Sequence, residues 1–290
     1  MIISFRSLCL FANLMLLMGW ASIANAENSE LTWHDNYSSA VKAATADKKM
    51  LVIYFYDESE AASRFENEVL TDRNVQELLG NYTLAKLSVD ANVTIEEKPT
   101  RILNHAAFGY MYGAAGIAIV DYTNNTPADF GQVVSQFNLR GPQGRTVEQM
   151  QVILTLPPGS LTQRTLIYAV RMHPEKPKST KGVFRRLLAL ETFRHSRNQA
   201  SMQLQGHHQW ESRFHQIKAQ LPGNLLPTEV CAESWPGQRL EDAAIECVRS
   251  WRHSSGHWSA VSADNVYYGY DMKRGRNGVW YATGIFARNR

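Results

Sequence analysis

The pattern of apolar and polar residues divides the first half of the chain into alternating strands and helices. Residues 50–56 form an unbroken run of apolar, β-branched and aromatic side chains, which predicts a central strand buried on both faces. Asp72 stands where an N-cap would precede a helix over residues 74–79. The other predicted elements are helices at 31–46, 61–69 and 147–154, strands at 82–89, 117–122 and 133–137, and a turn at Asn124-Asn125. This alternation predicts an α/β fold.

The pattern changes after Leu156-Pro157-Pro158-Gly159, a segment rich in residues that break helices and strands. We interpret this segment as a linker between two domains, 27–155 and 156–290. In the second domain, residues 240–251 give the clearest amphipathic helix, and Asn277-Gly278 gives a strong hairpin signal. The remaining predictions are helices at 161–172, 183–205 and 210–219, and strands at 266–272 and 279–286. Helices followed by a sheet predict an α+β domain.

The first 26 residues have the features of a secretory signal peptide. Arg6 supplies a positive charge, residues 8–20 are apolar, and Ala24-Asn25-Ala26 is a small-residue cleavage site. An uncleaved membrane anchor is the alternative, but the apolar run is shorter than the roughly 20 residues that a spanning helix needs. We therefore expect an exported protein, periplasmic or secreted, whose mature chain has no transmembrane segment.

The composition limits the partners that the chain can have. Its 290 residues are 44% hydrophobic and 20% charged, which is typical of a globular protein. The net charge of +3 includes no long basic run, so there is no electrostatic case for binding nucleic acid. The basic group at residues 273–276 is most simply a solvated hairpin end, and contact with an anionic lipid or polymer is the alternative.

Two cysteines, Cys231 and Cys247, remain after the predicted cleavage. Export to an oxidising compartment makes a disulfide between them one interpretation. Two buried free thiols are the other, because cysteine is commonly buried in protein cores. The spacing of the two residues fits neither a zinc knuckle nor a Cys-x-x-Cys redox pair.

Four segments of the first domain carry a resemblance to a known family. They are Trp33–Tyr37, Lys48–Tyr56, Phe65–Asp72 and Lys86–Asp90. Together they resemble thioredoxin-like domains of the exported type, over roughly residues 31–155. The family has a Cys-x-x-Cys motif where Ser59 and Ala62 stand here, and a cis-proline where Ala118 stands. Thiol–disulfide exchange needs a thiolate, so we expect a redox-inactive scaffold or partner-binding domain and not an oxidoreductase.

The second domain carries four segments whose order and spacing are informative. They are His195-Ser196 with Gly206-His207, then residues 229–232, then Trp251 with Ser254-Ser255-Gly256-His257, and finally Tyr281–Phe286. They resemble the CAP superfamily (SCP/PR-1-like proteins) in its bacterial form, over about residues 160–290. The resemblance implies an α-β-α sandwich, so the full prediction is a thioredoxin-like domain followed by a CAP-like domain.

The resemblance also implies a site. The family's cavity is lined by two histidines and two glutamates, and the matching positions here are His207, Glu229 and His257. The second glutamate has no clear match, with Glu233 and Glu246 the nearest carboxylates. Two imidazoles and a carboxylate form a ligand set that zinc accepts, which makes His207, Glu229 and His257 the predicted metal ligands.

The neighbouring residues receive simpler interpretations. We expect Gly256 to turn the backbone sharply and present His257 to the cleft. His195 is interpreted as a packed histidine, His208 as an exposed one and His253 as solvent-facing.

Three functions remain open on the sequence alone. The first is a binding module that holds a small apolar molecule, lipid or envelope component, with Trp210, Trp235 and Trp258 as an aromatic platform. The tryptophans can equally belong to the core or its rim. The second is a metal-assisted hydrolase or peptidase, in which an open zinc position activates water. The third is a structural or protein-interaction role. The first is the leading hypothesis.

Overall fold

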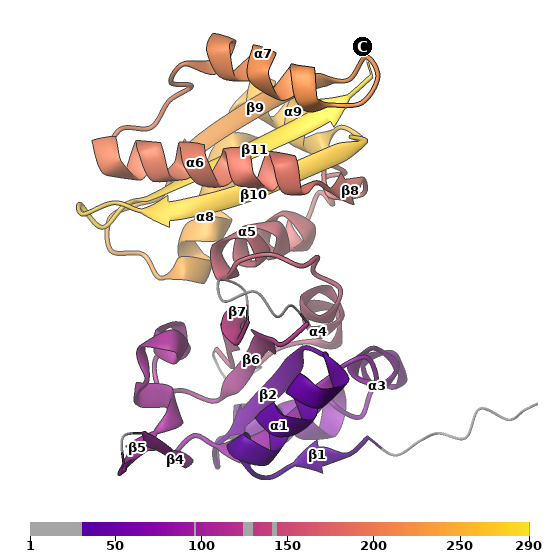
Figure 1. Cartoon of the computed structure of the whole chain (residues 1–290), viewed down its shortest axis with the longest axis vertical. Coiled ribbons are helices and arrows are strands. Elements are labelled where there is room, and N and C mark those ends of the chain that lie inside the picture. Colours follow the sequence, from indigo (N-terminus) through magenta and orange to yellow (C-terminus); the bar gives the residue numbers. More distant parts are fainter. Residues whose placement is uncertain (1–30, 96, 124–129, 141–143, 290) are drawn as a thin grey trace, which may run out of the picture. The chain divides into compact units, whose positions relative to one another are not determined.

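The computed structural model describes residues 31–95, 97–123, 130–140 and 144–289. The predicted signal peptide and the predicted Asn124-Asn125 turn lie outside these residues. Residues from Leu31 onward form one compact unit of mixed α/β fold that contains several sheets (Figure 1). No helix in the described part of the chain combines the length and the apolar character needed to cross a membrane.

The first large sheet has five strands in the order β1-β3-β2-β6-β7. Their bounds are β1 Trp33–His34, β2 Leu51–Tyr56, β3 Thr83–Ser88, β6 Gly116–Asp121 and β7 Gln132–Asn138. The strands β1, β2 and β3 run parallel, whereas β6 is antiparallel to both β2 and β7. The first five residues of β2 are fully buried, which confirms the predicted central strand.

The helices around this sheet lie close to the predicted positions, except that α1 begins only at Tyr37, because Trp33 and His34 form β1. They are α1 Tyr37–Asp47, α2 Glu60–Arg64 with a π-helical turn Phe65–Val69, α3 Arg73–Leu79 and α4 Val147–Leu154. Asp72 caps α3 as predicted, because its carboxylate accepts from the N–H groups of Asn74 and Val75. The segment between β3 and β6 was not predicted. It holds a small hairpin, β4 Asn92–Ile95 and β5 Lys98–Arg101, and two 3-10 turns, Ile102–Asn104 and Ala106–Met111.

The second large sheet has four strands in the order β8-β10-β11-β9. Their bounds are β8 Val183–Phe184, β9 Leu226–Glu233, β10 Tyr267–Arg274 and β11 Trp280–Arg288. The predicted β10–β11 hairpin is confirmed. Strand β9 was not predicted as a strand, and it pairs antiparallel with β11 at one edge of the sheet.

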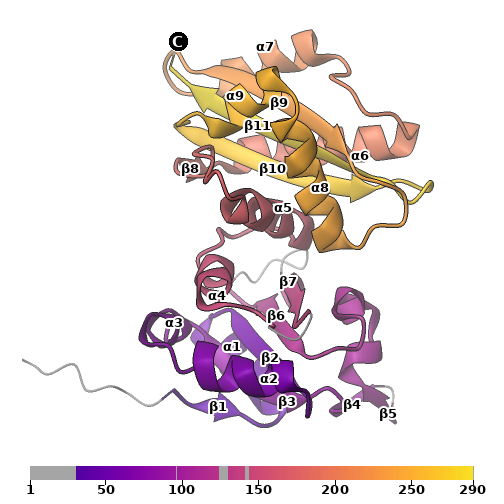
Figure 2. The same ribbon diagram turned by 180° about the vertical axis from the view of Figure 1, so that it is seen from behind.

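Helices cover both faces of this second sheet. The helices α6 Arg186–Met202 and α7 Trp210–Gln220 lie on one face, in front in Figure 1. On the other face lie α8 Leu240–Arg252 and α9 Ser255–Ser262, which are in front in Figure 2, and α5 Leu161–Met172 packs against α8 and β10. The amphipathic α8 buries Leu240, Ala243, Ala244, Cys247, Val248 and Trp251 along one side, which confirms its prediction.

Two local predictions are wrong. The helix predicted at 183–205 starts only at Arg186, because Val183 and Phe184 pair with β10. It ends at Met202, where Gln203 adopts the left-handed conformation (φ 53°) and caps the helix. Gly256 does not form a turn. It lies inside α9, so His257 projects from a helix.

A buried arginine joins the linker to both neighbouring helices and to β7. The Arg164 side chain on α5 is completely buried and donates to the carbonyl oxygens of Ile153, Leu156 and Pro157. It also donates to the Ser135 hydroxyl on β7 at 2.7 Å. A buried cation needs such partners, because an unsatisfied one would be strongly destabilising.

We predict that Arg164→Met lowers the free energy of unfolding by about 3–5 kcal/mol, because it leaves several buried carbonyl groups without a donor. Arg171→Met is the matched control. It removes an arginine on the same helix that donates to the exposed Thr155 carbonyl at 2.9 Å and to the Tyr268 hydroxyl at a long 3.4 Å, and it is expected to cost about 1 kcal/mol. Urea unfolding of both variants measures the difference, and equal losses would contradict the role assigned to Arg164.

Candidate functional site

The site is built around Glu229 on strand β9. Side chains alternate between the two faces of a strand. Val230 and Ala232 therefore join the core under α8, whereas Glu229 and Cys231 point toward α6 and α7. The Glu229 side chain has 0% exposure. A fully buried carboxylate is tolerated only when a counter-charge and hydrogen-bond donors accompany it.

The counter-charge comes from Arg213 on α7. Its guanidinium forms an ion pair with the Glu229 Oε2 atom. The same guanidinium lies over the Trp210 ring, 5.3 Å from the centroid. Arg213 was not predicted, because nothing in its local sequence distinguishes it from other helix-surface arginines. Only the pairing of β9 with β11 and the packing of α7 against β9 bring the two charges together.

His207 accompanies Glu229 from the loop between α6 and α7. Its Nδ1 atom lies 3.0 Å from Glu229 Oε1, and its side chain is 42% exposed. Since an ionised carboxylate can only accept, Nδ1 carries the proton and donates. The other ring nitrogen, Nε2, then has a free lone pair, and it lies 3.2 Å from Nε2 of His257 on α9. A carboxylate thus orients a pair of imidazoles at the edge of the sheet.

Both imidazoles of the pair favour the neutral form. Burial lowers the pKa of His207, and the nearby positive charge of Arg213 lowers it further. Burial also lowers the pKa of His257, with a smaller contribution from His207. Neutral imidazole is the form that binds metal ions.

The structure brings the three predicted residues together, but in a row. Glu229 contacts one nitrogen of His207 and His257 contacts the other. These nitrogens lie on opposite sides of the ring, so the three side chains do not meet at a single point. The predicted arrangement of all three as ligands of one ion is therefore corrected. His207 and His257 offer the ligand atoms, and Glu229 orients His207.

The remaining histidines near the site differ in role. His195 on α6 is buried, as predicted, and its Nε2 lies 2.9 Å from the Gly206 carbonyl oxygen and 3.7 Å from Glu229 Oε1. His208 is half-buried and lies 3.1 Å from the Leu204 carbonyl oxygen, so its interpretation as exposed is only partly right. His253 is exposed, as predicted.

The three tryptophans do not form one platform. Trp210 packs against Phe214 and Arg213 on α7. Trp258 on α9 stacks with His173, and its ring N–H donates to Glu175. Trp235, in the loop after β9, is 67% exposed. Each ring contacts a different set of neighbours, because the three come from opposite faces and one end of the sheet. The aromatic platform therefore stays a prediction, which these contacts do not support.

The two cysteines are free and buried, so the disulfide interpretation is wrong. Cys231 points toward α7, with its Sγ 3.7 Å from His207 Nδ1. Cys247 lies on α8 in the core on the opposite side of β9. Burial raises the pKa of the Cys231 thiol to about 12 and also raises the pKa of Cys247. The sheet itself separates the two sulfur atoms.

The predicted basic hairpin end is also partly wrong. Lys273 lies within β10 and is not freely solvated. Its Nζ lies 3.1 Å from the buried Asp271 carboxylate and 2.9 Å from the Thr162 hydroxyl oxygen. Burial raises the pKa of Asp271, and Lys273 opposes that shift. This pair ties β10 to α5.

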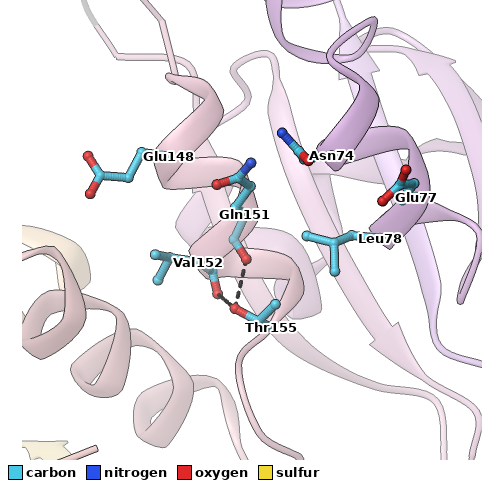
Figure 3. Close-up of a pocket in the computed structure, with 7 residues that line it drawn as sticks. All are labelled: Asn74, Glu77, Leu78, Glu148, Gln151, Val152 and Thr155. Atoms are coloured by element: carbon cyan, nitrogen blue, oxygen red, sulfur yellow. Dashed lines mark hydrogen bonds between the residues drawn. The ribbon is translucent and has the colours of Figure 1, made fainter. Parts of the chain in front are cut away.

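A surface groove elsewhere contains none of the predicted site residues. It lies between α3 and α4, has a volume of about 760 Å³, and is lined by Asn74, Glu77, Leu78, Glu148, Gln151, Val152 and Thr155 (Figure 3). Its two carboxylates already have partners, since Glu77 pairs with Arg73 and Glu148 pairs with Lys176. The Thr155 hydroxyl is hydrogen-bonded to the backbone of α4.

His195 provides a test of the electrostatics of the site. Burial lowers its pKa from 6.5 to about 4, and the positive charge of Arg213 adds to the shift. Between these values the unfolded chain binds a proton that the folded chain does not. The free energy of unfolding should therefore fall as the pH falls from about 6.5 to about 4, by about 3 kcal/mol.

We predict that His195→Gln removes most of this decline, because glutamine keeps an N–H donor for the Gly206 carbonyl but does not titrate. Urea unfolding at several pH values measures the effect. His253→Gln controls for the loss of an exposed imidazole. An identical decline in His195→Gln and in the unmodified protein would contradict the prediction.

Comparison with protein-family models and with curated proteins returns no match to this chain. The thioredoxin-like and CAP-like resemblances therefore stay predictions that rest on the residues quoted above, and any function has to come from the geometry of the site.

Proposed function

We propose that this protein is an exported binding protein of the cell envelope, periplasmic or secreted, in which His207 and His257 hold a divalent ion of the zinc class. The observation that carries the proposal is the 3.2 Å separation of the two Nε2 atoms, with a buried carboxylate on the far nitrogen of His207. Through the open positions of that ion the protein would take an acidic or polar group of an envelope component.

The distances fit such an ion. Zinc–nitrogen bonds are about 2.0–2.1 Å long, and two of them at a tetrahedral angle separate the nitrogens by about 3.3–3.4 Å. The observed separation is within about 0.2 Å of this value. The N–H of a metal-binding histidine usually donates to a carboxylate or carbonyl oxygen, and Glu229 occupies that position for His207. Nε2 of His257 offers its lone pair to the ion once the ring proton is on Nδ1.

The geometry favours binding over the hydrolase alternative. Metal-assisted hydrolysis needs a group that accepts a proton from the bound water. The carboxylate nearest the imidazole pair is Glu229, whose two oxygens already contact Arg213 and His207. With only two protein ligands, the ion keeps open positions that a bound partner can fill. The separation of the three tryptophans makes a purely apolar ligand a weaker choice.

Features of the two halves support the predicted families as part of this proposal. The strand order β1-β3-β2-β6-β7 with helices around it is compatible with a thioredoxin-like domain. At the position of the family's redox motif, the Ser59 hydroxyl accepts from the Ala62 N–H and caps α2. Ser59 therefore stabilises the start of this helix. The second sheet, with helices on both faces, is compatible with a CAP-like sandwich. We assign the first half a scaffold role and the second half the binding role.

We predict that His257→Ala lowers the zinc stoichiometry by one ion per chain at micromolar zinc, because a single remaining imidazole binds too weakly. Isothermal titration calorimetry of the metal-free protein measures the loss. His253→Ala, which removes an exposed histidine on the neighbouring α8–α9 connection, should bind as much zinc as the unmodified protein. Unchanged stoichiometry in His257→Ala would refute the proposed ion site.

The export part of the proposal has its own test. We predict that protein recovered from the expressing bacterium begins at Glu27, because Ala24-Asn25-Ala26 directs cleavage. N-terminal sequencing and cell fractionation check this expectation. A chain that keeps residues 1–26 and stays in the membrane fraction would support the anchor alternative.

A further inference from the structure

A second cluster of metal-binding side chains lies on the inner side of the His207 ring. The ligand atoms of His195, Glu229 and Cys231 all lie within 4.8 Å of one another, and all three residues are buried. His195 Nε2 is 3.7 Å from Glu229 Oε1. His207 Nδ1 is 3.7 Å from Cys231 Sγ, so this ring forms the outer wall of the cluster.

The strand pairing explains why these groups meet. Glu229 and Cys231 are two residues apart on β9 and therefore share one face. Helix α6 packs across the same face and places His195 beside them. One thiol, one imidazole and one carboxylate are all donors that zinc uses in structural and catalytic sites.

We propose that His195, Glu229 and Cys231 form a second, inner site for a zinc-class ion, separate from the His207–His257 pair. A tetrahedral zinc ion with bonds of about 2.0–2.3 Å holds its ligand atoms roughly 3.3–3.8 Å apart. The 3.7 Å between His195 Nε2 and Glu229 Oε1 lies within this range, and all the ligand atoms lie within 4.8 Å of one another, so small side-chain movements would complete the geometry. The site does not depend on the ion proposed at the outer pair.

Binding requires a defined set of proton changes. The Cys231 thiol loses its proton to solvent, because only the thiolate is a metal ligand. The Nε2 proton of His195, which faces the Gly206 carbonyl oxygen, is released while Nδ1 takes one up. Glu229 keeps Arg213 on Oε2, while Oε1 keeps one lone pair for His207 Nδ1–H and offers its other lone pair to the ion. The thiolate and the carboxylate then offset two of the three positive charges that the ion and Arg213 bring to the cluster.

Cobalt titration of the processed, metal-free protein tests the inner site, because Co²⁺ replaces Zn²⁺ and reports on thiolate ligands. We expect a near-ultraviolet thiolate-to-cobalt charge-transfer band and the visible bands of a tetrahedral ion. The band should disappear in Cys231→Ser, with an affinity loss of at least about 100-fold, since even indirect partners of a metal contribute 10–100-fold. Cys247→Ser is the matched control and should keep the band.

The variants separate the two proposals. His257→Ala removes the outer pair and should leave the charge-transfer band intact, so failure of one site does not imply failure of the other. A band that persists in Cys231→Ser would overturn the inner site. If Cys231→Ser does not fold, the charge-transfer band of Cys247→Ser tests the inner site instead. Its processed chain holds Cys231 as the single cysteine, and the lack of a band at saturating cobalt would overturn the proposal.

Discussion

The buried carboxylate of Glu229 is the interaction on which the site depends. Removing a carboxylate from water is strongly unfavourable unless a charge and hydrogen bonds compensate for it. Here Arg213 supplies the charge and one N–H donor, and His207 supplies a second donor. Three separate segments, α7, the loop before it and β9, must therefore dock in one register for the fold to be stable. The same docking sets the orientation of the exposed imidazole, so stability and the binding geometry have a common origin.

The position of β9 at the edge of its sheet gives the site its access. A carboxylate on a central strand would be covered on both sides by neighbouring strands and helices. At the edge, α9 packs against β9, and its His257 reaches His207, which belongs to the helical layer of the other face. The imidazole pair thus joins the two helical layers across the sheet edge. His207 is accessible to solvent, whereas the Glu229 carboxylate behind it is fully buried.

Local features were predictable from the sequence, and long-range ones were not. The helix at 161–172 was predicted, and it begins after Ser160, which forms a capping box with Gln163. The helix α8 was predicted from its apolar stripe. Strand β9 was missed because Pro227 and two glutamates hide its alternation, and because its partner β11 is about 50 residues away. Arg213 was missed for the same reason, since its ion-pair partner Glu229 lies on another element, β9. The grouping of His207, Glu229 and His257 was predicted from a family resemblance. Their arrangement in a row depends on how β9, α9 and the loop before α7 pack together, which the local sequence does not indicate.

The placement of Cys231 and Cys247 on opposite sides of one strand has a consequence for how the protein matures. In the part of the chain that the structure describes, both cysteines are free, so forming this native state involves no oxidative step. Folding of this chain would then proceed without a thiol oxidase or isomerase, and reducing agents would leave the folded protein intact. The folded chain would then be stabilised by its apolar core and its buried ion pairs, such as those of Arg145 with Glu241 and Arg213 with Glu229.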